Sequence, residues 1–338
     1  MREYNLCFLG FGNVGRALAR LLQTKSKEMR EQFGIKWRIT GVAARRMGWI
    51  ASPDGIDVDE ILAGKNVSQD VPAPDNVRDW LRAARADVLF ETSSLEPFTG
   101  QPAIEHIRAA LENGAHAITA NKGAVVHGFE ELSALAATRG KCFMFESTVA
   151  DCLPVFSLFR ETLPAARLLS FRAVLNSTTN IILEEIERGR TFDEGVARAQ
   201  ALGVTETDPG YDVDGLDSAV KVCALARVLM NAPLMLEEIQ REGIRHLSAE
   251  SIREARAAGT PFKLISQAQR TDDGRILASV RPEQLASDDP LASTSGTTLT
   301  INFELDVLHG MTLTAHNPNL KSTAYGLLAD FINAVTRS

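Results

Sequence analysis

The chain has 338 residues, of which 45% are hydrophobic and 23% are charged, as in a globular protein large enough for two domains. A formal net charge of −7 argues against a protein that binds nucleic acid or an anionic membrane through its charge. No apolar run is long enough to span a membrane, and no signal peptide precedes the first strand. The four cysteines have neither disulfide nor zinc spacing, so we expect a cytoplasmic protein with reduced thiols.

The N-terminus carries a glycine motif in a defined structural context. Residues 5–9 form an apolar strand, residues 10–15 read Gly-Phe-Gly-Asn-Val-Gly, and residues 16–22 have the pattern of a helix. In this arrangement the first glycine makes a tight turn, the second lets a pyrophosphate approach the backbone, and the third lets the helix pack on the strand. The motif predicts a dinucleotide site made by Gly10, Gly12, Asn13, Val14 and Gly15, whereas an ordinary structural turn is the alternative.

The second strand, residues 37–43, indicates which dinucleotide is bound. It ends in Ala43-Ala44-Arg45-Arg46, where an acidic residue would bind the ribose hydroxyls of NAD. Two arginines suit the 2′-phosphate of NADP instead, so we expect NADP(H) to be preferred, with NAD(H) as the alternative cofactor. Both arginines also fit an ordinary solvated loop.

The rest of the first half alternates strands with helices. Strands are predicted at residues 87–91, 115–119 and 142–146, and helices at 101–113 and 129–138. This order is typical of an α/β fold with a Rossmann-like, doubly wound parallel sheet. Thr92, Ser93 and Lys122 follow strands of that sheet, at the edge where such sheets bind ligands, so we expect them to contact the cofactor.

The pattern changes after Leu163, where strands and helices no longer alternate evenly. Strands are predicted at 167–175, 262–267, 276–282 and 298–305, and helices at 181–188, 191–203, 248–259 and 323–334. This predicts a second α+β domain for substrate binding. We expect residues 1–147 with 320–338 to form the dinucleotide-binding domain, and residues 148–319 to form the second domain.

The segment from Glu206 to Lys221 concentrates charged residues around one helix start. Asp217 and Lys221 lie four residues apart on the helix after Gly215 and therefore point to one side, while Glu206 and Asp212 lie on the loop before it. Carboxylates for an ammonium group and a lysine for a carbonyl oxygen suit an amine-bearing substrate with a reducible carbonyl. A surface helix with an ordinary ion pair is the alternative.

Several motifs, taken in order, resemble homoserine dehydrogenases over nearly the whole length. They are the glycine motif at 10–15, Thr-Ala-Asn-Lys at 119–122, Glu-Ser-Thr-Val at 146–149, Leu-Asn-Ser-Thr-Thr-Asn at 175–180, Ala-Leu-Gly-Val-Thr-Glu at 201–206, Gly-x-Asp-x-x-x-Lys at 215–221, and the ending at 323–330. The resemblance implies the short form of the family, without a regulatory ACT domain. It implies the reversible, NAD(P)-dependent conversion of L-aspartate 4-semialdehyde and L-homoserine, a step toward threonine and methionine.

The resemblance also implies residue roles. Lys221 is expected to be the acid–base residue, with Lys122 polarising the carbonyl oxygen and Asp217 orienting the lysine. Substrate binding would fall to Glu206, Asp212, Thr178 and Ser177, and a monovalent cation (Na⁺ or K⁺) to Glu146, Val149, Asp151 and Leu153. The strands after Phe262 are expected to pair in a homodimer.

The chain departs from the family pattern at three places. Residues 150–152 read Ala-Asp-Cys where small residues and glycine are usual, Ser177 replaces a glycine, and residues 316–321 replace a glycine-rich loop. Ser177 and the lost glycine-rich loop would accommodate one alternative, a sister dehydrogenase acting on another amino- or hydroxy-acid semialdehyde. An alternative of another class is a catalytically silent nucleotide sensor, against which Lys221, Lys122 and Asp217 argue.

Overall fold

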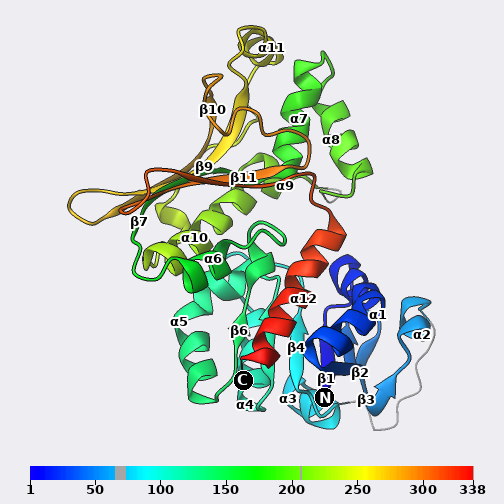
Figure 1. Cartoon of the computed structure of the whole chain (residues 1–338). Helices are drawn as coiled ribbons and strands as arrows, with labels where there is room; N and C mark the ends of the chain where they lie inside the picture. The colour runs from blue at the N-terminus through cyan, green and yellow to red at the C-terminus, as the bar shows by residue number, and fades with distance from the viewer. Residues whose placement is uncertain (65–73, 206–207, 338) are drawn as a thin grey trace. The chain divides into compact units, whose positions relative to one another are not determined.

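The computed structural model describes residues 1–64, 74–205 and 208–337. The chain divides into two compact units. The first contains residues 1–152 and the C-terminal segment from Leu320, and the second contains residues 153–319. Figure 1 shows the elements of both.

The first unit is built on a six-stranded sheet with the strand order β3-β2-β1-β4-β5-β6. All neighbouring strands are parallel except β2 and β3. The chain order reverses at β1, so the carboxyl ends of β1 and β4 meet at a topological switch point. The predicted doubly wound parallel sheet is confirmed, but β3, which contains Pro53 and Gly55, was not predicted. The strands are β1 (Arg2–Leu9), β2 (Ile35–Ala44), β3 (Gly48–Ile56), β4 (Val88–Glu91), β5 (His116–Thr119) and β6 (Phe143–Met144).

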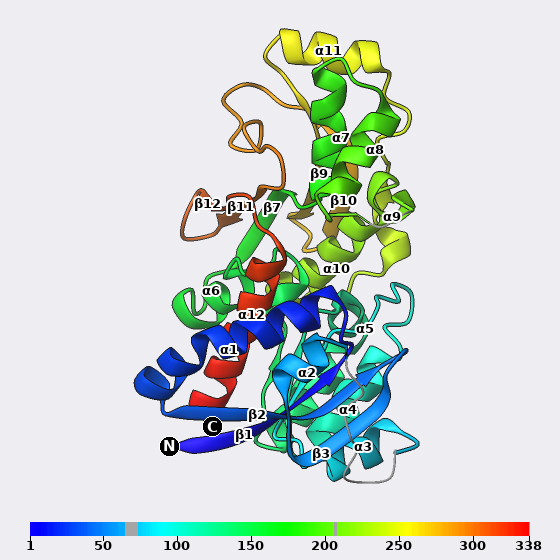
Figure 2. The ribbon, with the colours of Figure 1, turned by 90° about the vertical axis from the view of Figure 1, so that its right-hand side faces the viewer.

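Helices cover this sheet, and two of them come from opposite ends of the chain. Helix α1 (Asn13–Phe33) and helix α12 (Leu320–Thr336) lie side by side against it (Figures 1 and 2). The Phe90 ring lies 5.1 Å from that of Phe8 on β1 and 5.9 Å from that of Phe331 on α12. The C-terminal helix is therefore part of the core of the first unit. The other helices are α2 (Val58–Leu62), α3 (Val77–Ala83), α4 (Ala103–Glu112), α5 (Lys122–Thr138) and the short η1 (Glu146–Thr148).

Helix α5 begins at Lys122 rather than at the predicted Phe129. The Asn121 side chain accepts a hydrogen bond from the Gly123 amide and caps the helix. Two glycines in its first turns hid this start in the sequence, because glycine lowers helix propensity. Lys122 is therefore the first helical residue after β5.

The second unit is built on another six-stranded sheet, with the order β12-β11-β7-β9-β10-β8. Its strands are antiparallel, except that β8 runs parallel to β10. The predicted strands are present, and β8 and β12 were missed. The strands are β7 (Leu168–Val174), β8 (Gln240–Arg241), β9 (Phe262–Arg270), β10 (Ile276–Gln284), β11 (Leu299–Leu305) and β12 (Met311–Ala315).

The helices of the second unit show the expected capping chemistry. The Thr191–Glu194 capping box is present at the start of α8, and the Ser248 side chain caps α11. Helix α7 begins at Ser177, earlier than predicted, because the Asn176 side chain accepts a hydrogen bond from the Thr179 amide. The helices are α6 (Val155–Thr162), α7 (Ser177–Glu187), α8 (Phe192–Ala201), α9 (Gly210–Val213), α10 (Leu216–Met230), η2 (Leu236–Glu238) and α11 (Ala249–Ala257).

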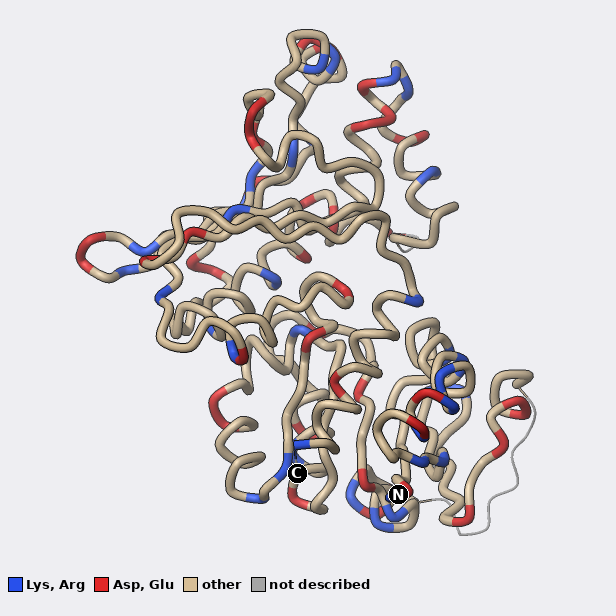
Figure 3. The backbone as a smooth tube through the Cα atoms, viewed as in Figure 1, with Lys and Arg blue, Asp and Glu red and all other residues tan. Residues whose placement is uncertain are grey.

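Acidic and basic residues both occur throughout the chain (Figure 3). Within the described ranges, none of the helices combines the length and the apolar character needed to cross a bilayer. The four cysteines are free thiols, and two of them, Cys7 and Cys223, are buried.

Candidate active site

The three glycines of the N-terminal motif meet different surroundings. Gly10 has φ +91°, and a Cβ there would lie 2.4 Å from the Thr92 carbonyl oxygen. A Cβ on Gly15 would lie 2.7 Å from the Gly10 carbonyl oxygen, whereas one on Gly12 would meet nothing within 4 Å. Gly10 and Gly15 are therefore required by packing, and Gly12 faces open space of the kind that a cofactor phosphate can fill.

A cavity of about 760 Å³ opens beside this turn, at the switch point of the sheet. It is lined by predicted cofactor residues from three strand ends, namely Gly10, Gly12, Arg45, Arg46, Thr92 and Ser93. Asn13, Val14 and Gly15 form the first turn of α1, whose amides have no partner within the helix. Lys122 is not among the residues that line this cavity.

Other residues of this cavity were not predicted from the sequence. Trp49 lines it from β3, and Arg16, whose guanidinium stacks on the Phe11 ring at 5.3 Å, lines it from α1. His106 lines it from α4. Nothing in the pattern of α4 or β3 distinguishes these positions, since they approach the glycine turn only when the sheet is assembled.

Beneath the cavity lies a buried carboxylate. Glu91, at the end of β4, is fully buried, and its Oε2 accepts a hydrogen bond of 2.9 Å from Thr119 Oγ1. Its Oε1 accepts hydrogen bonds from the amide and the hydroxyl of Ser93 and lies 3.7 Å from His106 Nδ1. These bonds fix the orientation of Ser93 at the edge of the cavity.

In the second unit, Lys221 and Asp217 form a half-buried ion pair on α10. Lys221 Nζ lies 2.9 Å from Asp217 Oδ2 and donates a hydrogen bond of 2.6 Å to the Leu175 carbonyl oxygen. Gly215, at φ +75°, turns the chain from α9 into this helix. Among the described residues these contacts use two of the three N–H donors of Lys221.

A second carboxylate lies in the same polar cluster. Asp212 Oδ2 accepts hydrogen bonds of 2.9 Å from both Thr178 and Thr205. The amide of Asn176 bridges the two carboxylates, donating to Asp212 at 2.6 Å and to Asp217 at 3.2 Å. The fold thus brings together Asp212, Asp217, Lys221 and Thr178, all predicted from the sequence. Asn176 and Thr205 are additional members of the cluster.

Two other predicted substrate residues have different positions. The Ser177 hydroxyl donates to the Thr297 carbonyl oxygen at 3.1 Å, so it fastens the helix start to a neighbouring loop. Glu206 lies outside the described residues.

The predicted cation residues lie in the segment after β6. Glu146 belongs to η1 and donates its amide to Asp330 on α12 at 2.8 Å, and Val149 follows it. Asp151 adopts φ +54°, the conformation that glycine usually supplies, and its carboxylate accepts a hydrogen bond from Thr323. Leu153 is the first residue of the second unit. No cluster of three His, Cys, Asp or Glu side chains with metal-binding geometry occurs within the described ranges.

The strand order, the glycine turn and the cavity at the switch point define a dinucleotide-binding protein of the Rossmann class. Residues 10–146 match the family model of the homoserine dehydrogenase NAD-binding domain, and residues 154–332 match that of homoserine dehydrogenase. The chain belongs to the homoserine dehydrogenase family, whose members are NAD(P)-dependent oxidoreductases acting on a CH–OH group.

Individual relatives match this chain over nearly its whole length. An NAD(+)-dependent homoserine dehydrogenase of Pseudomonas canavaninivorans is 36% identical over 98% of this chain and 96% of its own. A homoserine dehydrogenase of Methanocaldococcus jannaschii is 30% identical over 97% and 98%.

Solved structures agree with this assignment. The homoserine dehydrogenase of Thiobacillus denitrificans has a TM-score of 0.82 and 29% identity, over 100% of this chain and 74% of its own. A hyperthermophilic archaeal homoserine dehydrogenase in complex with NADPH has a TM-score of 0.82 and 27% identity, over 100% and 99%.

Proposed function

We propose that the protein interconverts L-homoserine and L-aspartate 4-semialdehyde, with Lys221 as the acid–base residue. The observation that carries this proposal is the ammonium group of Lys221, held by Asp217 and the Leu175 carbonyl oxygen beside the second carboxylate, Asp212. A bound nicotinamide cofactor supplies or accepts the hydride. In reduction, Lys221 donates a proton to the oxygen that was the carbonyl, and in oxidation its neutral amine removes the hydroxyl proton.

Asp217 acts as a positioning residue in this proposal. Its carboxylate fixes the direction of the Lys221 side chain from one turn earlier on α10, so the third N–H is aimed at one place. Lys122, at the start of α5, is proposed to polarise the same oxygen; this role rests on the family resemblance.

We propose that the other carboxylate, that of Asp212, recognises the amino group of the substrate. Asp212 is held by Asn176, Thr178 and Thr205, which fixes a negative charge for the substrate ammonium. Glu206 is proposed to act with it, and Ser177 to narrow the site where relatives have glycine. The hydroxyl of Thr178 contributes by orienting Asp212.

For the cofactor we propose a preference for NADP(H). Arg45 and Arg46 are both exposed at the rim of the nucleotide cavity, in the turn between β2 and β3, and no acidic residue ends β2. Two guanidinium groups suit a 2′-phosphate. NAD(H) is the alternative, supported by the relative that is named as NAD(+)-dependent.

Three further proposals concern the assembled protein. A monovalent cation would bind near residues 146–153, mostly through backbone oxygens, with Asp151 as a side-chain ligand. A homodimer would form through the sheet of the second unit. A cytoplasmic location is proposed because the cysteines are free thiols.

The test is a coupled measurement of turnover and nucleotide binding. The purified protein is assayed for nicotinamide reduction with L-homoserine and NADP⁺ or NAD⁺ at alkaline pH, with Na⁺ or K⁺ added. We expect turnover with the wild type and a loss of at least about a hundredfold in Lys221→Ala. Nucleotide bound without turnover of homoserine would contradict the proposal and would favour another semialdehyde or a silent sensor.

A further inference from the structure

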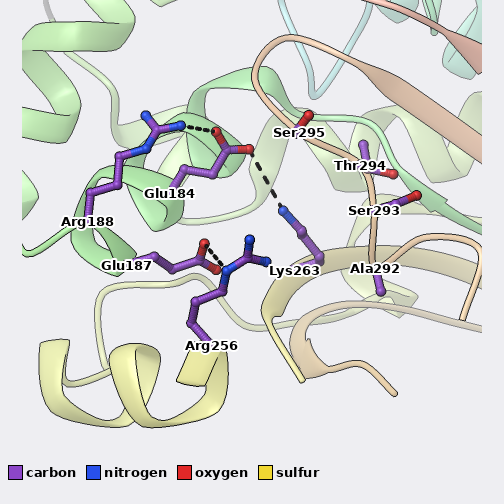
Figure 4. A pocket seen from close by; sticks show the side chains of 9 residues that line it. All are labelled: Glu184, Glu187, Arg188, Arg256, Lys263, Ala292, Ser293, Thr294 and Ser295. Carbon is purple, nitrogen blue, oxygen red and sulfur yellow. Dashed lines mark ion pairs between the residues drawn. The ribbon is translucent and has the colours of Figure 1, made fainter. Parts of the chain in front are cut away.

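The second unit contains a separate polar cavity of about 370 Å³. Figure 4 shows the residues that line it, which come from the C-terminal half of α7, from α11, from β9 and from residues 292–295. Its volume is within the range of small-molecule sites.

This cavity is distinct from the polar cluster around Lys221. Both use helix α7, but Thr178 contacts Asp212 at the start of the helix, whereas Glu184, Glu187 and Arg188 line the cavity from its other end. At 1.5 Å per residue, Thr178 and Glu187 are separated by roughly 13 Å along the helix axis.

A buried lysine that the proposed reaction does not use lies in one wall. Lys263 is 3% exposed, and its Nζ donates a hydrogen bond of 2.8 Å to Asn180 Oδ1 and lies 4.0 Å from Glu184 Oε1. The same Glu184 oxygen accepts the Gly296 amide at 2.7 Å. Glu184 is therefore occupied by the protein itself, as Figure 4 shows for its ion pairs.

Glu187 is different, because one of its oxygens is left over. Its side chain is only 8% exposed, and its Oε2 lies 3.6 Å from Arg256 Nε. The buried Oε1 accepts no hydrogen bond from any residue that the structure describes. A buried acceptor without a partner is costly, and burial raises the pKa of the Glu187 carboxyl. A hydrogen-bond donor entering the cavity would remove this cost.

Cationic side chains also line the cavity. Lys263, Arg188 and Arg256 lie beside Glu184 and Glu187, and Arg188 also forms an ion pair of 2.6 Å with Glu185, which does not line the cavity. The side chains of Arg188 and Arg256 are 64% and 59% exposed, so their guanidiniums lie nearer to solvent than Glu187 does. A ligand thus meets an acceptor inside and cations at the rim.

We propose that this cavity binds a small α-amino acid, with its ammonium on Glu187 Oε1 and its carboxylate on the guanidiniums of Arg256 and Arg188. Glu187 and Arg256 are direct neighbours, which matches an ammonium and a carboxylate carried on the same carbon atom. The cavity, at about 370 Å³, has room for such a ligand.

The test is calorimetric titration of the full chain with glycine, L-alanine, L-serine, L-threonine and L-valine, one at a time. Propionate and ethylamine serve as probes that each lack one of the two charged groups of alanine. We expect at least one amino acid to bind once per chain, and neither single-charge probe to bind. The affinity should fall at least about tenfold in Glu187→Gln and in Arg256→Ala.

Matched variants separate this site from the rest of the protein. Glu254→Gln and Arg253→Ala alter exposed residues on the same helix as Arg256, outside the cavity, and should bind as the wild type does. Binding should also survive Lys221→Ala. The proposal is overturned if no amino acid binds, if propionate binds as well as alanine does, or if Lys221→Ala abolishes the binding and Glu187→Gln does not. Thermal melting verifies that each variant is folded.

Discussion

Lys221 and Asp217 point to the same side of α10, one turn apart, with Nζ and Oδ2 separated by 2.9 Å. An acidic residue four positions before a lysine is the favourable order for such a pair. The pair is only partly exposed, at 12% and 17% for the two side chains, so solvent screens it less than it screens a surface ion pair. The remaining N–H of the lysine therefore has a defined direction.

Replacing Asp217 by Asn should lower the kcat of homoserine oxidation by about 10- to 100-fold, because the lysine loses the charge that holds it. The KM for homoserine should change less than kcat does, because Asp217 orients the lysine rather than holding the substrate. Stopped-flow and steady-state assays measure both constants. A variant with unchanged kcat, or with impaired nucleotide binding, would contradict the positioning role.

The two glycines at the start of α1 should respond differently to alanine. Gly12→Ala should leave the melting temperature unchanged, because a Cβ there meets nothing within 4 Å, but should weaken nucleotide binding at least about tenfold by obstructing the phosphate. Gly15→Ala should destabilise the fold, since its Cβ would lie 2.7 Å from the Gly10 carbonyl oxygen. Thermal unfolding and fluorescence titration with NADPH distinguish the two. Equal melting temperatures for both variants would show that the turn can accommodate a Cβ at Gly15 and would contradict this prediction.

Arg45 and Arg46 should determine cofactor choice. The double variant Arg45→Ala with Arg46→Ala should raise the KM for NADP⁺ by about 10- to 100-fold, because the 2′-phosphate loses two charge-assisted partners. The KM for NAD⁺, which has no such phosphate, should change little. Arg20→Ala, an exposed arginine of α1 outside the cavity, is the control. An equal effect on both cofactors would mean that these arginines do not read the phosphate.

His116 should make the first unit sensitive to acid. Burial lowers its pKa from 6.5 to about 4, and its Nδ1 accepts the Cys142 amide at 3.1 Å. The unfolded chain binds a proton below about pH 6.5, whereas the folded protein does so only near pH 4. Stability is therefore complete above pH 6.5 and falls as the pH drops toward 4, by roughly 3 kcal/mol in total.

The corresponding variant is His116→Asn, whose side-chain oxygen can still accept the Cys142 amide but does not titrate. Urea unfolding between pH 7 and pH 4 should show a shallower loss of stability than in the wild type. His309→Asn, at an exposed position, is the control. Identical pH slopes for the wild type and His116→Asn would refute the assignment.

The local chemistry of this protein can be read from its amino-acid sequence. The glycine motif between an apolar strand and a helix, the capping residues Thr191 and Ser248, and the spacing of Asp217 and Lys221 all depend on neighbours within a few residues. Such features can be read from a sequence because turn geometry and helix periodicity are local properties. The family was likewise evident from the order of its motifs.

Contacts between residues far apart in the sequence depend on how the helices and strands pack. Asn176 bridges Asp212 and Asp217 because β7 delivers it to the start of α10, and His106 reaches the nucleotide cavity because α4 packs beside β4. The left-handed backbone conformations of Asp151 and Asn317 likewise became visible only in the assembled structure. The sequence around Lys263 indicates only a strand. Its side chain is buried because α7 and residues 292–296 pack over it. These contacts join segments far apart in the chain, and packing between elements, which no local pattern encodes, determines them.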